Sequence, residues 1–147
     1  MTVSNRQIRR LAFQVLFQID ARGEIDADLV RETLDVPDNF GDREVRKSFD
    51  LGLEAYKGRK AADDVMEKLA PGWPAARQPA VDRAILRLAH FEMTSGRTPG
   101  RIAVAEAVEL AKEFGSEKSP GFVNALLDKV LKSLPAQDAP PGDPGPT

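Results

Sequence analysis

Apolar residues recur with a helical period along most of the chain, and this pattern constrains the fold more than any other feature. Between residues 8 and 19 they follow steps of three and four, which form one face of an amphipathic helix. The members of this first stripe are Ile8, Leu11, Ala12, Val15, Leu16 and Ile19. No segment shows the alternation of apolar and polar residues that is typical of a half-buried strand. The sequence therefore predicts an all-α fold.

Local start and stop signals divide the chain into separate helices. Ser4 and Gln7 have the spacing of a capping box, and Gly23 follows the last apolar residue of the first stripe. A further short helix is expected after Gly58. The other helices are expected at about residues 26–34, 43–57, 81–93, 102–114 and 119–134, with a turn at 36–41.

The strongest internal break is Pro71–Pro79, where three prolines and one glycine cannot continue a helix. We expect it to join two sub-bundles, about residues 5–70 and 76–134, within one domain that spans residues 1–134. Residues 135–147 contain five prolines and two glycines. This composition predicts a disordered tail.

Composition excludes several classes of chemistry. The chain has no cysteine and a single histidine, His90. The absence of cysteine excludes thiol chemistry and zinc ribbons, and a lone histidine does not supply a histidine-based metal site or a catalytic triad. No nucleotide-binding glycine motif is present. We therefore expect a protein that is not an enzyme and that needs no metal and no cofactor. The polar start, residues 1–7, predicts no secretory signal, and no apolar run is long enough for a membrane span, so a cytoplasmic location is compatible with the sequence.

The net charge of −2 argues against coating nucleic acid by bulk electrostatics, so any such site must be local. Residues 1–22 carry a side-chain charge of +3 and contain Arg6, Arg9 and Arg10, whose planar forks suit phosphate. Phe13 and Phe17 lie opposite the main stripe of this helix. We favour a core position for both rings, with an exposed stacking platform or a homodimer face as alternatives.

The start of the last helix is a second candidate site. Ser119 and Pro120 form a helix-start pair, with Ser119 expected as the N-cap, while Gly115 suits the end of the preceding helix. Free N–H groups at a helix start attract anions, and Lys118 stands beside them. Phe122 lies at the edge of the apolar stripe, where it either stacks on a base or packs as a half-buried ring.

Acidic residues line one face of the predicted helix 102–114. Glu106, Glu109 and Glu113 follow helical spacing. They form either a solvated surface or a docking face for a basic partner.

Three segments resemble the NusB family of bacterial transcription antitermination factors. The segment VAEAVELAKEFGSEKSPGFVNALLDKVLK, residues 104–132, resembles the C-terminal signature of that family. AVDRAILRLAHFEM, residues 80–93, resembles its preceding helix, and RRLAFQVLFQID, residues 9–20, resembles its arginine-rich first helix. The resemblance covers about residues 5–134.

This resemblance implies two small helical bundles built around the N-terminal helix. It implies binding of the boxA element of ribosomal RNA leader transcripts together with NusE, a small-subunit ribosomal protein, in the antitermination complex of RNA polymerase. By position, the family's RNA contacts fall on Arg6, Arg9, Arg10, Lys118, Ser119 and Phe122. NusE would dock on the C-terminal helices, where the family's acidic residue corresponds to Asp82, and Glu106 would belong to the partner face.

The chain departs from the family pattern at three positions. Ala105 replaces an asparagine, Ala125 replaces a glycine, and Lys118 stands where an acid is frequent. A change toward lysine favours RNA. Two alternatives remain open: a helical protein-interaction module without RNA binding, and an RNA methyltransferase. The second would need an α/β domain, whereas this chain continues into the Pro/Gly-rich tail.

Overall fold

A computed structural model describes residues 2–23, 28, 32 and 34–135 of the protein. Every regular element in these residues is helical, which confirms the all-α expectation. In chain order they are α1 (Asn5–Arg22), α3 (Asp42–Lys57), α4 (Arg59–Leu69), η1 (Ala75–Arg77), α5 (Ala80–Thr94), α6 (Gly100–Phe114) and α7 (Ser119–Ser133). The helix expected at 26–34 and the tail expected at 135–147 fall almost wholly outside the described residues. None of the described helices is both long and apolar enough to cross a bilayer.

The capping residues of α1 act as the sequence predicts. The hydroxyl of Ser4 accepts a hydrogen bond from the N–H of Gln7 at 3.1 Å, and the Gln7 side chain accepts one from the N–H of Ser4 at 3.0 Å. At the other end Gly23 adopts φ 71°, the left-handed conformation that favours glycine, and donates its N–H to Ile19. Both ends of α1 are therefore specified locally.

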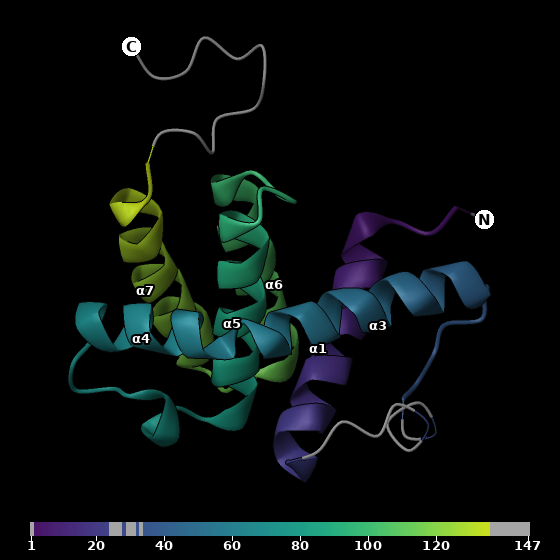
Figure 1. The fold of residues 1–147 in the computed structure, drawn as a ribbon, viewed down its shortest axis with the longest axis horizontal. Coiled ribbons are helices and arrows are strands. Elements are labelled where there is room, and N and C mark those ends of the chain that lie inside the picture. The colour runs from purple at the N-terminus through teal and green to yellow at the C-terminus, as the bar shows by residue number, and fades with distance from the viewer. Residues whose placement is uncertain (1, 24–27, 29–31, 33, 136–147) are drawn as a thin grey trace, which may run out of the picture.

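The remaining helices pack around α5 (Figure 1). α6 and α7 lie beside it, and α1 packs against both α3 and α5. α3 and α4 follow one another across the front of the other helices, with a break at Gly58. α4 contacts α5 and α7, so helices from both sides of Pro71–Pro79 share one interior.

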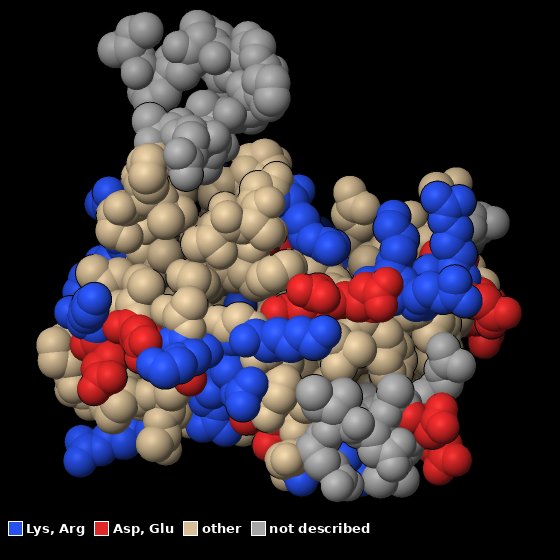
Figure 2. All heavy atoms as spheres, in the orientation of Figure 1, with Lys and Arg blue, Asp and Glu red and all other residues tan. Residues whose placement is uncertain are grey.

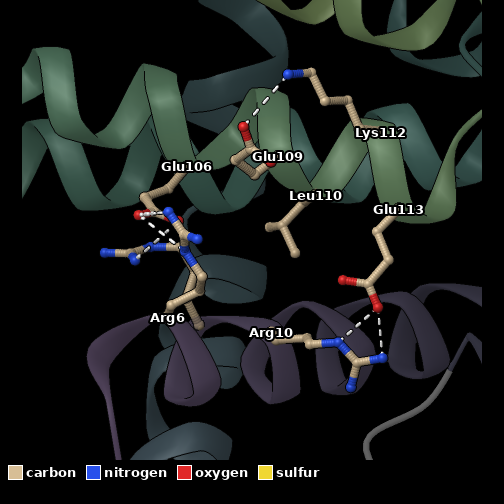
Figure 3. Close-up of a pocket in the computed structure, with 8 residues that line it drawn as sticks. Arg6, Arg10, Glu106, Glu109, Leu110, Lys112 and Glu113 are labelled. Atoms are coloured by element: carbon tan, nitrogen blue, oxygen red, sulfur yellow. Dashed lines mark hydrogen bonds and ion pairs between the residues drawn. The ribbon is translucent and has the colours of Figure 1, made fainter.

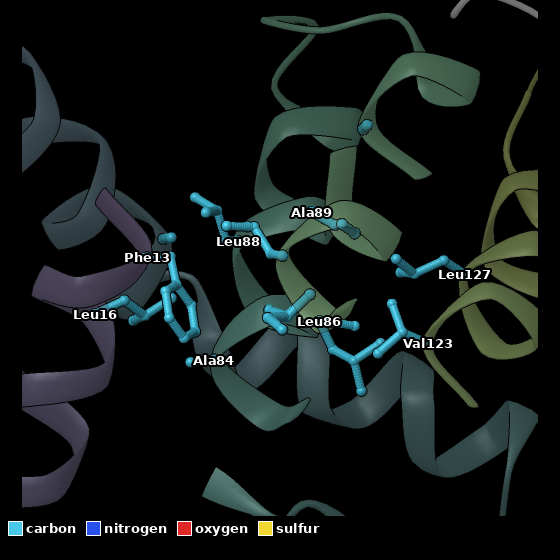
Figure 4. Close-up of a cluster of buried hydrophobic side chains, with 14 of the residues drawn as sticks. Phe13, Leu16, Ala84, Leu86, Leu88, Ala89, Val123 and Leu127 are labelled. Atoms are coloured by element: carbon cyan, nitrogen blue, oxygen red, sulfur yellow. The ribbon is translucent and has the colours of Figure 1, made fainter. Parts of the chain in front are cut away.

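The core consists of two clusters that meet on α1. The larger cluster joins residues of α1, α3, α4, α5, α6 and α7, part of which Figure 4 shows. Phe13 and Leu16 belong to it, whereas Val15 and Ile19 pack in the smaller cluster against α3. The first helix is therefore buried on two sides. The core position predicted for Phe13 is confirmed, and Phe17 is half-buried at the edge of the larger cluster.

The turn between α6 and α7 differs from the expectation. Lys118, rather than Ser119, is the N-cap of α7, because the Ser119 hydroxyl accepts a hydrogen bond from the N–H of Ser116 at 2.9 Å. Gly115 does end α6, but with φ −90° it does not need a glycine's conformational freedom. A Cβ there would lie 2.5 Å from Ser119 and 2.8 Å from the carbonyl of Ala111, so close approach requires the glycine.

Ion pairs connect α5 to α1 and to α4. Arg83 donates to Asp20 of α1 at 2.7 Å. Arg87, which is almost fully buried, donates to Asp20 at 3.1 Å and to Asp63 of α4 at 2.8 Å. Burial disfavours the charged Asp20 carboxylate, but the two guanidinium groups outweigh it and lower its pKa. These contacts fix the position of α1 relative to α5.

Candidate functional site

Side chains of α1 and α6 meet along a shallow groove, which we call the α1–α6 seam (Figure 3). Its lining residues are Arg6, Arg9, Arg10, Glu106, Glu109, Leu110, Lys112 and Glu113. Arg6 donates from Nε to Glu106 at 3.0 Å and from Nη2 at 3.1 Å, yet its side chain remains two-thirds exposed. The carboxylate raises the pKa of Arg6 by hydrogen bonding and by charge. Arg6 is therefore oriented by α6 and still open to solvent.

Arg10 has a comparable arrangement one turn further along α1. Its Nε donates to Glu113 at 2.7 Å, and its guanidinium lies 5.1 Å from the ring centre of Phe114. Both Arg10 and Glu113 are well exposed. Phe114 in turn packs against Phe13 at 4.8 Å between ring centres, so the Arg10 guanidinium lies over a ring at the edge of the core. The fork of Arg10 remains accessible to a ligand.

Arg9 differs from its two neighbours because it points into the protein. It is 8% exposed and donates two hydrogen bonds of 2.8 Å to Glu92, which is 3% exposed. Thr98 adds a third contact by donating to the same carboxylate at 2.6 Å. Burial alone would lower the pKa of Arg9, but Glu92 outweighs it and the pKa is raised. Of the three predicted arginines, this one is enclosed by the fold.

The second predicted region, at the start of α7, is only partly accessible. Lys118 is exposed and has no ion-pair partner among the described residues. Phe122 is half-buried, and its ring lies 6.3 Å from that of Trp73, edge to face. Ser119 is 1% exposed, so its hydroxyl does not reach the surface. Lys118 and Phe122 are thus the two predicted residues here that a ligand can touch.

The two regions adjoin through the end of α6. Arg10 stacks on Phe114, the last residue of that helix, and the turn at 115–118 leads directly to Lys118. Four residues of chain span at most about 14 Å. The backbone of Lys118 therefore lies within about 14 Å of that of Phe114, the residue on which Arg10 stacks.

The two residues predicted for a protein partner are less accessible than expected. Asp82 is buried near the start of α5, and its Oδ1 has no hydrogen-bond partner among the described residues. Glu106 is largely covered, with Arg6 at 3.0 Å and Arg9 at 3.9 Å. The acidic face of α6 is therefore neither simply solvated nor free, because two of its three glutamates hold arginines of α1.

Two groups of exposed residues were missed by sequence reasoning. Trp73 is 54% exposed within Pro71–Pro79, and its absence from every apolar stripe was the available signal. Arg43 and Lys47 line a second groove and have no ion-pair partner in the described part of the chain. On the face shown in Figure 2, basic atoms gather over the start of α3, and elsewhere basic and acidic groups are interspersed. This face carries no broad surface of a single sign.

Comparisons with known proteins agree on one family. The model of the NusB family matches residues 6–132. A relative from Solibacter usitatus, named transcription antitermination protein NusB, is 38% identical over 94% of this chain and 95% of its own length.

Solved structures extend the likeness to the fold. T. maritima NusB superposes with a TM-score of 0.81 at 28% identity, covering 94% of this chain and 98% of its own. The antitermination factor NusB in a complex with NusE and double-stranded RNA gives a TM-score of 0.74 at 27% identity, covering 88% and 96%. The resemblance noted in the sequence is thereby confirmed, and the chain belongs to the NusB family.

Proposed function

We propose that this protein is a transcription antitermination factor that binds boxA-type RNA of ribosomal RNA leader transcripts together with NusE. The observation that carries the proposal is the accessibility of Arg6, Arg10 and Lys118 in a chain whose relatives are named antitermination proteins. A related NusB is found in complex with NusE and RNA. Assembly into the antitermination complex of RNA polymerase is part of the same proposal.

The predicted RNA contacts divide into two roles. Arg6, Arg10 and Lys118 supply charge to phosphates, and Phe122 supplies an aromatic edge. Arg9 and Ser119 are buried, so they act by holding α1 and the α6–α7 turn in place. Loss of either would weaken RNA binding only by disturbing the positions of the others.

Three phosphate contacts make a modest electrostatic contribution. For single strands, each neutralised phosphate contributes about −0.7 to the salt slope, so three give about −2. Affinity would then fall roughly 20-fold when salt rises from about 50 to 200 mM. Binding by the isolated chain is therefore expected to be weak, and NusE would strengthen it by adding RNA-contacting surface.

Protein contacts are proposed for the C-terminal helices. NusE would bind the region of Asp82 and Glu106. Because both carboxylates are covered, NusE would contact the residues around them. A homodimer would use the groove beside Phe17 and Phe114, on the side of α1 opposite its main stripe.

The decisive experiment is an anisotropy titration of labelled boxA-type RNA, with and without NusE, at two salt concentrations. Arg10→Ala and Lys118→Ala should each weaken binding several-fold and reduce the salt slope by about 0.7. Lys129→Ala is the matched control, since Lys129 is an exposed lysine further along α7. Equal affinities for all three variants and the wild type would refute the proposed RNA site.

A protein-interaction module without RNA binding is the second candidate. The acidic face of α6 motivates it, because Glu106, Glu109 and Glu113 offer a docking surface to a basic partner. This alternative predicts binding of NusE with no change in RNA anisotropy, even at low salt.

A further inference from the structure

The proline-rich connection between α4 and α5 presents the only tryptophan of the chain at the surface. Trp73 is 54% exposed, and Ile102 at 51% is the other large apolar residue exposed to this degree among those described. A single exposed apolar side chain is ordinary in a soluble protein. A binding role for Trp73 therefore has to be argued from the residues around it and not from its exposure alone.

The backbone around Trp73 is held from both sides. Its N–H donates to the carbonyl of Ala70 at 2.9 Å, and its own carbonyl accepts from the buried side chain of Gln78 at 3.1 Å. Arg83 donates to the carbonyl of Ala75 in the same connection at 3.0 Å. The indole is thus held outward by a restrained loop, which reduces the entropy lost when a ligand packs on it.

The Trp73 ring adjoins the surface already proposed for RNA. It meets Phe122 at 6.3 Å between ring centres in a T-shaped arrangement, and Trp73 as a whole stays 54% exposed. One turn before Phe122, Lys118 is exposed, and Gly121 has open space where a Cβ would stand. Arg77 of η1 adds a second exposed cation without an ion-pair partner in the described residues, while Glu117, next to Lys118 in the chain, is an exposed acid.

An aromatic face beside free cations is the combination that proteins use for unpaired nucleotides. A protein partner would instead require a contiguous apolar patch. Among the described residues no other large apolar side chain is as exposed near Trp73, because Trp73 lies near the start of α7 and Ile102 lies near the opposite end of α6, roughly 18 Å away at 1.5 Å per helical residue.

We propose that Trp73 is an RNA-binding residue that stacks on an unpaired base, extending the RNA surface from Lys118 and Phe122 onto the connection between α4 and α5. This inference rests on the proposed function. Stacking is tolerant of base identity, so Trp73 would contribute affinity more than sequence preference. It would also leave the salt dependence unchanged, because no ion is released.

The test follows one titration by two signals. Labelled single-stranded boxA-type RNA reports binding by anisotropy, while emission from the single tryptophan reports contact at Trp73 itself. We expect saturable quenching with the same midpoint as the anisotropy change. Trp73→Leu should weaken binding by about 5- to 150-fold at an unchanged salt slope, and Trp73→Phe should recover most of the loss.

Ile102→Ala is the matched control, since it removes the other exposed apolar side chain and should leave binding unchanged. Circular dichroism of every variant checks that the helices are retained. If RNA binds without quenching Trp73 emission, and Trp73→Leu binds RNA with wild-type affinity, the role of Trp73 is overturned while the proposed function stands. A blue shift caused by NusE alone, with no quenching by RNA, would assign the indole to a protein contact and also overturn it. Absence of RNA binding would refute both.

Discussion

Replacing Glu92 by alanine should lower the free energy of unfolding by roughly 3–5 kcal/mol, the usual effect of breaking a buried ion pair. Arg9 and Glu92 are 8% and 3% exposed, and the guanidinium loses two hydrogen bonds of 2.8 Å. Glu106, 3.9 Å from Arg9, compensates in part, which favours the lower end of the range. This loss is a large fraction of the stability of a typical domain, about 5–15 kcal/mol.

Thermal and urea denaturation followed by circular dichroism would measure the effect. For a chain of this size the melting temperature should fall by roughly 10–20 °C. Arg10→Ala provides the comparison, because its exposed pair with Glu113 should be worth about 1 kcal/mol or less. If Glu92→Ala is no more harmful than Arg10→Ala, the assignment of Arg9 to the interior is wrong.

A double variant separates structure from RNA contact. Arg9→Met combined with Glu92→Leu removes both charges and should recover much of the lost stability, since no uncompensated charge stays buried. This variant should bind RNA as the wild type does, because Arg10 and the rest of the surface are unchanged. A folded double variant that has lost RNA binding would contradict a purely stabilising role for this ion pair.

Three further predictions concern stability. Gly115→Ala should cost about 1–3 kcal/mol in urea denaturation, because its Cβ would lie 2.5 Å from Ser119. Ser4→Ala should cost about 1 kcal/mol in a thermal melt, since the N–H of Gln7 loses its cap. Burial lowers the pKa of His90 despite the nearby Asp63, so the unfolded state binds more protons and stability should fall as pH drops below about 6.5. Urea denaturation at several pH values should show a flatter profile for His90→Gln, and an unchanged slope would contradict this role.

Local signals explain why most of the fold was predictable. The capping box at Ser4 and the left-handed Gly23 act within one helical turn, so their residue types carry the information. The apolar stripes likewise mark the buried face of each helix. Ser119 shows the limit: a serine hydroxyl can also accept from a preceding turn, and here the N–H of Ser116 is the competing donor, so the helix starts one residue earlier than expected.

The site was less predictable because its geometry depends on helices distant in sequence. Arg6, Arg9 and Arg10 share one side of the first helix, and nothing local distinguishes them. Their environments are decided by Glu92 of α5 and the glutamates of α6, more than eighty residues later. Trp73 was missed for a different reason: it lies in a loop, so its absence from every apolar stripe was the single signal that it is exposed.

The pairing of Arg6 and Arg10 with glutamates does not oppose RNA binding. The Arg10–Glu113 pair is exposed and contributes little net free energy, so a phosphate can replace the carboxylate at small cost while using the same donors. Glu106 is largely covered, but Arg9 lies 3.9 Å from it as a second cation when Arg6 turns to a phosphate. In the absence of RNA, Glu106 and Glu113 hold the guanidinium groups of Arg6 and Arg10 at the α1–α6 seam, so that these groups do not rotate freely in solvent. Arg9 cannot exchange its carboxylate for a phosphate, because the buried Glu92 carboxylate would then be left without its cation. Burial therefore separates three chemically identical side chains into one that holds the fold together and two that can change partners.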